Sequence, residues 1–145
     1  MEKEKSAGAV IFKPGKEGNK YLLLHYGAGH WDFPKGHVEK NESEEETVRR
    51  EVKEETGIEG IAILKGFKEK IHYFYRFEGK LLSKDVIFFL ARTDQEDVKI
   101  SFEHIGFEWL LSKEAFERLT YKNAKEILKK ANEFLGKNKS LSEFY

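Results

Sequence analysis

Apolar runs and turn-rich segments alternate through the first part of the chain. Residues 6–12 (SAGAVIF) and 20–26 (KYLLLHY) are apolar and β-prone, and the intervening residues 13–19 (KPGKEGN) are dense in glycine, proline and asparagine. This pattern predicts a β-hairpin. Residues 27–37 (GAGHWDFPKGH) hold three glycines and a proline among aromatic and basic residues, which predicts a loop.

A helix is predicted over residues 43–56, because Asn41 or Ser43 can cap its start and Gly57 can end it in a left-handed conformation. Further strands are predicted after this helix, at 58–70, 71–79, 84–93 and 106–110. The segment 84–93 (KDVIFFLART) has an unbroken apolar centre, so we expect that strand to be buried on both faces.

The pattern becomes helical from Ser112, which we expect to cap a helix with Glu114 in its first turn. A stripe of apolar residues then follows at helical spacing: Phe116, Leu119, Ile127, Leu128 and Phe134. We expect a loose tail at residues 136–145, which leaves residues 1–135 as a single domain. Strands interleaved with two helices predict an α/β domain with a mixed sheet.

The composition narrows the possible functions. The 145 residues include 26 Lys and Arg against 26 Asp and Glu, and this neutral net charge argues against a protein that coats nucleic acid. The absence of cysteine excludes disulfides, thiol nucleophiles and cysteine-ligated metals. There is no signal-peptide pattern and no apolar stretch near the ~20 residues of a membrane span, so we expect a cytoplasmic protein without a membrane partner.

Negative charge is concentrated on one side of the predicted 43–56 helix. At about 100° per residue, four glutamates share one arc beside Val48 and Val52: Glu44, Glu51, Glu54 and Glu55. Two carboxylates ~6 Å apart repel by about 1 to 3 kcal/mol, and the C-terminal end of a helix already carries partial negative charge. Clustered hard oxygen ligands suit Mg²⁺ or Mn²⁺, so this arc predicts a divalent metal site.

The spacing of the same segment resembles the Nudix box. Gly36 is followed after five residues by Glu42, and after seven more by residues 50–58 (REVKEETGI). This resemblance implies the Nudix fold over nearly the whole chain, a mixed β-sheet sandwiched between helices. It also implies an Mg²⁺-dependent pyrophosphohydrolase that acts on a small molecule, a nucleoside diphosphate linked to another group. By family analogy, Arg50 pairs with Glu42 and aims the helix rather than touching substrate.

The resemblance implies roles for the other acidic positions. Glu51 and Glu55 resemble metal ligands, with Glu54 as a further ligand or as the base that activates water, and the backbone carbonyl of Gly36 can join the metal shell. Glu103, in SFEHIGFEWL, sits where many relatives place another acid, so it is also a candidate ligand or base. The implied reaction is an in-line attack of metal-activated water on one phosphorus, without a covalent enzyme intermediate.

Residues outside the box resemble one subfamily, the asymmetric dinucleoside tetraphosphate hydrolases, which split diadenosine tetraphosphate into ATP and AMP. The similar segments run along most of the chain: 30–39, 66–75, 84–91, 102–110 and 118–128. The resemblance implies that Lys35 and Lys84 hold phosphates as point charges. His30 and His37 flank the loop and can also bind phosphate.

Three tyrosines are candidates for holding the base. Tyr73 and Tyr75 point to one face of a predicted strand, where the subfamily places a stacking tyrosine. Counting from the box favours Tyr75, whereas matching the preceding GFK segment favours Tyr73. Tyr121 matches an aromatic residue that can cover the other face of adenine. Trp31 and Phe33 are expected to anchor the loop.

Other functions remain open at this point. A Nudix hydrolase could instead act on nucleoside triphosphates or on 5′-triphosphorylated or capped RNA ends, although the neutral charge argues mildly against RNA. A Nudix-fold binding module without catalysis is a further alternative, but such proteins usually lose box glutamates and none is missing here. The oligomeric state, monomer or homodimer, is also left open.

Overall fold

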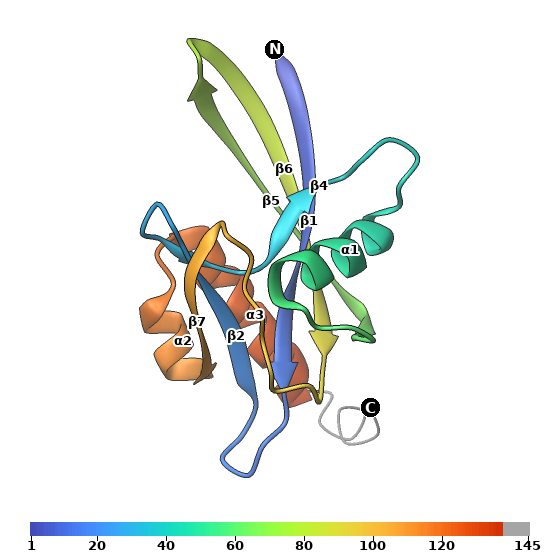
Figure 1. The fold of residues 1–145 in the computed structure, drawn as a ribbon, viewed down its shortest axis with the longest axis vertical. Helices are drawn as coiled ribbons and strands as arrows, with labels where there is room; N and C mark the ends of the chain where they lie inside the picture. The colour runs from blue at the N-terminus through green and yellow to red at the C-terminus, as the bar shows by residue number, and fades with distance from the viewer. Residues whose placement is uncertain (138–145) are drawn as a thin grey trace.

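A seven-stranded mixed sheet forms the framework of the described part of the chain, residues 1–137 of the computed structural model (Figure 1). The strands are β1 (Glu2–Lys13), β2 (Lys20–Tyr26), β3 (Trp31–Asp32), β4 (Lys35–His37), β5 (Ala62–Phe77), β6 (Lys80–Arg92) and β7 (His104–Leu111). The helices are α1 (Glu44–Thr56), α2 (Ser112–Arg118) and α3 (Lys122–Lys137).

The strand order places the N-terminal strand at the centre of the sheet. The main path runs β3-β2-β1-β6-β5, with β4 paired to β1 and β7 paired to β2. β1 and β2 pair antiparallel, so the hairpin predicted over residues 6–26 is confirmed. β6 runs parallel to β1, whereas the other pairs are antiparallel, and the sheet is therefore mixed as predicted.

The two faces of the sheet pack against different helices (Figure 1). On one face, Ile87 of β6 belongs to a core cluster that contains Val48 of α1. On the other face, Phe88 belongs to a cluster that contains Ile127 of α3. Residues 86–91 are at most 8% exposed, which confirms that this strand is buried on both sides. The predicted fold class, a mixed sheet between helices, is also confirmed.

The segment predicted as a loop, residues 27–37, contains two short strands. β3 pairs with β2, and β4 pairs with β1, so the prediction of a loop was wrong for these strands. Gly8 of β1 allows the close approach, because a Cβ atom at residue 8 would lie 2.5 Å from the carbonyl oxygen of Pro34. Phe33 is fully buried, as expected for a residue that anchors this segment.

One long strand replaces two of the predicted strands. Residues 58–70 and 71–79 were expected to form separate strands, but β5 is continuous from Ala62 to Phe77. Its pairing with β6 shifts register between Ile63 and Lys68, where Gly66 has a φ of 94°. An irregularity of this kind bends a strand without ending it, so pairing resumes beyond the glycine.

The C-terminal segment that was predicted to be helical from Ser112 consists of two separate helices, α2 and α3. Ser112 is the first residue of α2, and the cap position is Leu111, which has no capping side chain; the predicted Ser112 cap was therefore wrong. Phe116 is 40% exposed, so it does not contribute to the predicted apolar stripe. The other four predicted positions do belong to the core or pack against it: Leu119, Ile127, Leu128 and Phe134.

The end of α3 overlaps the start of the predicted tail. Residues 136–137 are helical, and residues 138–145 lie outside the described residues. The boundary of the predicted 1–135 domain stays a prediction. Among the helices of residues 1–137, none has the length and apolar character needed to span a bilayer.

Helix α1 begins and ends with the signals that its sequence predicts. Of the two cap candidates, Ser43 is the cap: its hydroxyl accepts from the N–H of Glu46 at 3.1 Å, and the Glu46 carboxylate accepts from the N–H of Ser43 at 2.8 Å. Gly57 ends the helix with a φ of 74°, in the left-handed region. These local bonds determine where the acidic helix starts and stops.

Replacing Ser43 should destabilise the fold through this cap. We expect Ser43→Ala to lower the free energy of unfolding by about 1 kcal/mol in urea denaturation, because the backbone N–H of Glu46 loses its acceptor. Ser43→Asn should retain most of the stability, since asparagine caps comparably well. An equal loss in both variants would contradict the capping role.

Candidate active site

Arg50 of α1 holds several carboxylates in a defined arrangement. Its guanidinium forms a fork on Glu42, with Nε 2.7 Å from Oε2 and Nη2 3.0 Å from Oε1. Nη1 donates to Glu51 at 2.7 Å, and Nη2 donates to the carbonyl oxygen of His37 at 2.9 Å. Hydrogen bonds from Arg50 and Thr47 lower the pKa of Glu42 to about 2. The Arg50–Glu42 pair implied by the sequence is thus present, and it ties α1 to the β4 segment.

Gly36 of β4 lies directly against the carboxylate of Glu51. A Cβ atom at residue 36 would overlap the carboxyl carbon and both oxygens of Glu51. Any other amino acid would therefore displace that carboxylate or the strand. Glu54, on the same helix, lies farther out: its side chain is 58% exposed and its Oε2 is 3.3 Å from Nη1 of Arg50.

Glu55 is the buried member of the acidic group, only 4% exposed. Its Oε2 accepts from the N–H of Lys35 at 3.2 Å, and its Oε1 accepts from the hydroxyl of Tyr26 at 3.4 Å. Nε2 of His104 lies 3.1 Å from the same Oε1, but within residues 1–137 this buried nitrogen has no well-oriented hydrogen bond. These hydrogen bonds hold the carboxyl group of Glu55 in place, but they come from neutral groups and supply no positive charge.

The electrostatics of this cluster fit a divalent cation. Burial, reinforced by Glu51 and Glu103, raises the pKa of Glu55. Burial lowers the pKa of His104, so its imidazole is neutral near pH 7. One ligand atom each from Glu55, Glu103 and His104 lies within 4.8 Å of the others. Carboxylate oxygens beside an orphaned neutral nitrogen suit a divalent ion, whose charge would relieve the repulsion between the acids.

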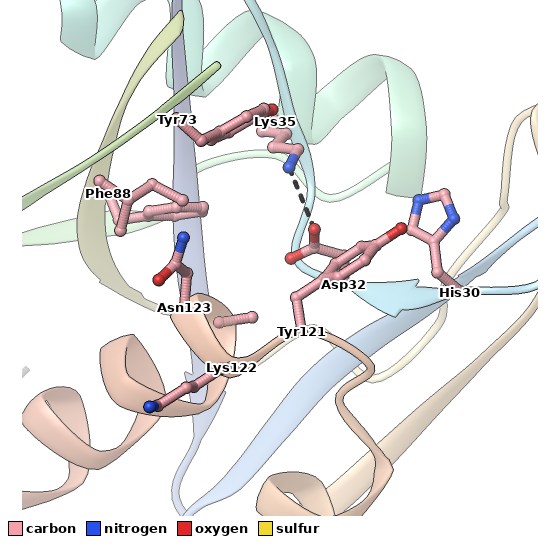
Figure 2. A pocket seen from close by; sticks show the side chains of 10 residues that line it. His30, Asp32, Lys35, Tyr73, Phe88, Tyr121, Lys122 and Asn123 are labelled. Atoms are coloured by element: carbon pink, nitrogen blue, oxygen red, sulfur yellow. Dashed lines mark hydrogen bonds and ion pairs between the residues drawn. The ribbon is translucent and has the colours of Figure 1, made fainter. Parts of the chain in front are cut away.

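A cavity of about 550 Å³ lies beside the segment that carries Lys35 (Figure 2). Its aromatic lining comes from β5, β6 and the segment before α3: Tyr73, Phe88 and Tyr121. Its polar lining includes His30, Asp32, Lys35, Lys122 and Asn123. Aromatic faces combined with cations suit a planar base that carries phosphates.

Two residues connect the cavity to the carboxylates. The backbone of Lys35 donates to Glu55, while its ammonium pairs with Asp32 in the cavity at 3.0 Å (Figure 2). Tyr26 donates to Glu55 and stacks on His30, with ring centroids 4.6 Å apart. A ligand in the cavity would therefore have the acidic cluster as its neighbour.

The cations of the cavity differ in how firmly they hold their charge. Burial opposes the charge of Lys35, but Asp32 outweighs it and raises the pKa. Lys84 is not part of the cavity lining but lies opposite Tyr73 on the adjacent strand, and burial and the neighbouring Lys35 lower its pKa. Burial also lowers the pKa of His30. The charges of Glu4 and Asp32 act on Lys84, but within residues 1–137 Lys84 forms no ion pair like that of Lys35 with Asp32, so an anionic ligand would add a partner.

The structure separates some residues that the sequence grouped together. Tyr73 lines the cavity, whereas Tyr75 does not and its hydroxyl bonds to Glu4. His37 is 64% exposed in its side chain, with Nδ1 3.8 Å from Glu4. His30, in contrast, lines the cavity next to Tyr121. Only one of the two histidines that flank the loop therefore reaches the cavity.

Several residues of the site did not emerge from the sequence, among them Tyr26, Asp32, His104 and Asn123. Asp32 and His104 lie in the segments 30–39 and 102–110, each close to a predicted site residue, so proximity in sequence was an available signal. Nothing in the sequence indicated that Asp32 and His104 would be buried, with exposures of 3% and 5%. Asn123 likewise lies in the segment 118–128, two residues from the predicted Tyr121. For Tyr26 the hydrophobic pattern offers no signal, because only the packed fold brings it to the site.

The chain is similar to known proteins over most of its length. The NUDIX domain family model matches residues 2–131. The bis(5′-nucleosyl)-tetraphosphatase (asymmetrical) of Mus musculus is 35% identical over 90% of this chain and 95% of its own length. The protein of the same name from Caenorhabditis elegans is 35% identical, over 90% and 96%. The crystal structure of a C. elegans Ap4A hydrolase binary complex has a TM-score of 0.81 at 33% identity, covering 92% of this chain and 98% of that one.

Filling the space at Gly36 should disturb the carboxylate cluster. We expect Gly36→Ala to weaken Mn²⁺ binding by about tenfold or more, measured by electron paramagnetic resonance, because the methyl group displaces Glu51. Gly136→Ala is the matched control, since a Cβ there meets nothing within 4 Å. Unchanged Mn²⁺ affinity in a folded Gly36→Ala variant would contradict the assignment of Glu51 to the metal site.

Proposed function

The chain belongs to the NUDIX domain family, and on that basis we propose that it hydrolyses diadenosine tetraphosphate asymmetrically, to ATP and AMP. The observation that carries the proposal is the carboxylate cluster of α1 beside a cavity lined by tyrosines and cations. The similar proteins named as asymmetrical tetraphosphatases support the same substrate. The chain is thus a Nudix hydrolase, and the tetraphosphate is its proposed substrate.

Nudix hydrolases generally need a divalent metal, and the acidic residues of this chain fit one. The proposed ion is Mg²⁺ or Mn²⁺, held by Glu51, Glu55 and the carbonyl of Gly36, with Glu54 or Glu103 completing the set. When bound, such ions would neutralise polyphosphate charge and make an attacking water more acidic.

The acidic side chains have separate tasks in an in-line hydrolysis. Either Glu54 or Glu103, both solvent-exposed, takes the proton of the attacking water. The water oxygen then bonds to one phosphorus as the anhydride bond on its far side breaks, which releases ATP and AMP. Arg50 touches no substrate atom in this scheme; it positions Glu51 and the helix through its fork on Glu42.

The cations beside the cluster hold the phosphates. Lys35 and His30 are the best placed because they line the cavity. Lys84 lies across from Tyr73 and gains a partner when an anion binds. His37 keeps its proposed phosphate role only at the outer edge, since its side chain is mostly exposed.

The base occupies the aromatic part of the cavity. Tyr73 is the proposed stacking tyrosine in preference to Tyr75, because only Tyr73 lines the cavity. Tyr121 is 51% exposed and covers the other face of the base. Stacking of this kind contributes about 1 to 3 kcal/mol per base.

Some features of the protein stay predictions. These are the cytoplasmic location and the oligomeric state, which is expected to be a monomer or a homodimer. Nucleoside triphosphates and triphosphorylated or capped RNA ends are the alternative substrates. Their hydrolysis gives products other than those of the tetraphosphate, and one assay can separate them. The binding-module alternative differs by giving no metal-dependent turnover.

The first experiment is hydrolysis of diadenosine tetraphosphate with Mg²⁺ in ¹⁸O-labelled water, with products resolved by mass. We expect ATP plus AMP, with the label in only one of them, because a single phosphorus is attacked. Two ADP molecules would mean symmetric attack and would contradict the proposal. Turnover of nucleoside triphosphates or RNA ends alone would retain the Nudix chemistry and exclude the proposed substrate.

Single substitutions should identify the base. Of Glu54→Gln and Glu103→Gln, we expect the variant that lacks the base to lose about a hundredfold or more in kcat while keeping its Mn²⁺ affinity. A variant that lacks a metal ligand should lose both kcat and Mn²⁺ affinity. Glu45→Gln is the control, since Glu45 is an exposed residue in the first turn of the same helix. Full activity in both variants would exclude both candidates.

A further inference from the structure

The outer edge of β3 is bonded to Thr120, a residue of the turn between α2 and α3. β3 is the last strand on the main path of the sheet. The carbonyl of His30 accepts from the N–H of Tyr26 in β2 at 2.9 Å, so the peptide groups of the next residue, Trp31, face away from β2. There the N–H of Trp31 donates to Oγ1 of Thr120 at 2.8 Å, and the N–H of Thr120 donates to the carbonyl of Trp31 at 3.3 Å. One residue thus satisfies both polar groups of an edge strand.

Trp31 is itself held by contacts with three other elements. Its indole stacks on His25 of β2, with ring centroids 4.3 Å apart and an angle of 9° between the planes. The guanidinium of Arg118, the last residue of α2, lies 4.8 Å from the centroid of the indole. Arg118 also donates to Glu108 of β7 at 2.7 Å. Thr120 therefore bonds to a residue whose position is already fixed.

The turn that carries Thr120 has further anchors on its helical side. Leu119 is 2% exposed and belongs to the core, and its N–H donates to the carbonyl of Ala115 at 3.0 Å. The N–H of Lys125 donates to the carbonyl of Tyr121 at 3.1 Å. These contacts tie the turn to α2, α3 and the core, whereas the bridge from Thr120 ties it to β3.

The bridge joins two backbone segments that carry opposite parts of one cavity lining. Tyr121 directly follows Thr120, and His30 and Asp32 directly flank Trp31; Tyr121, His30 and Asp32 all line the cavity. Figure 2 shows the ring of Tyr121 extending from the turn before α3 toward His30, and their ring centroids are 5.5 Å apart. The separation between Tyr121 and the β3 side of the cavity therefore depends on this bridge.

We propose that Thr120 is a positioning residue, which holds Tyr121 at stacking distance from the base through its bridge to Trp31. The inference rests on the proposed function, because it takes the base to lie against Tyr121. The Tyr121 side chain is 51% exposed, so its backbone has a large part in placing the ring. A gap of ~0.5 to 1 Å forfeits about a quarter to a half of a van der Waals contact, so a small shift of the turn weakens stacking.

The informative variant is Thr120→Val, which keeps the branched shape but puts a methyl group where the N–H of Trp31 needs an acceptor. Thr120 lies on the surface, so the variant should fold. We expect the dissociation constant for AMP, measured by calorimetry, to rise about threefold to tenfold. For diadenosine tetraphosphate, KM should rise while kcat stays unchanged, because the base is held equally in the ground and transition states.

The matched control is Thr120→Ser, which retains the hydroxyl and should bind AMP like the wild type. A second test combines Thr120→Val with Tyr121→Ala. In that background Thr120→Val should raise the dissociation constant no further, because no ring is left to position.

Three outcomes would overturn the inference. The first is an AMP affinity of Thr120→Val equal to that of the wild type, or no AMP binding by the wild type. The second is an equal loss in Thr120→Ser, which would exclude the hydroxyl as the cause. The third is a loss of the same size with and without the Tyr121 ring, which would show that the effect does not pass through Tyr121.

The products of diadenosine tetraphosphate separate this inference from the proposed function. If the wild type forms ATP and AMP but Thr120→Val leaves KM and the AMP affinity unchanged, only the role of Thr120 fails. If the wild type does not cleave diadenosine tetraphosphate asymmetrically, the proposed function fails, and the AMP affinities of the variants still decide the role of Thr120.

Discussion

Like-charged carboxylates held close together at one end of α1 are the constraint on which the rest of the site depends. Glu51 and Glu55 share one side of the helix, and Glu103 approaches from the start of β7. Arg50 offsets part of the repulsion, and burial raises the pKa of Glu55. A positive counter-charge stabilises groups that repel one another in this way, and divalent ions would supply it.

The fold brings this cluster and the aromatic cavity together from opposite layers. α1 packs on one face of the sheet, while the turn that carries Tyr121 and Asn123 leads into α3 on the other face. The short strands β3 and β4 lie on β2 and β1, respectively. Lys35 of β4 connects the two parts of the site, because its backbone donates to Glu55 and its ammonium pairs with Asp32 in the cavity. Gly8 is essential to this arrangement, because a side chain there would push the segment off β1.

Predictions that rest on interactions between neighbouring residues were more accurate than those that depend on contacts between distant parts of the chain. The caps at Ser43 and Gly57 are local hydrogen-bonding signals: α1 ends at Thr56 as predicted and begins at Glu44, directly after Ser43, one of the two predicted caps. The predicted cap at Ser112 was wrong because the chain enters α2 directly from β7, whose pairing places Leu111 at the cap position. The division of residues 58–79 into two strands was wrong because pairing with β6 continues past the irregularity near Gly66 to Phe77.

The sequence by itself determined the acidic helix, the Arg50–Glu42 pair and the family, because these depend on spacing along a single stretch of chain. Only the tertiary structure shows that Tyr73 lines the cavity whereas Tyr75 bonds to Glu4, because the two residues share one strand face and are equivalent in the pattern. It also added Asp32, His104 and Asn123 to the site. The reason is physical: burial and mutual approach arise from packing between elements distant in sequence, and no local pattern encodes them.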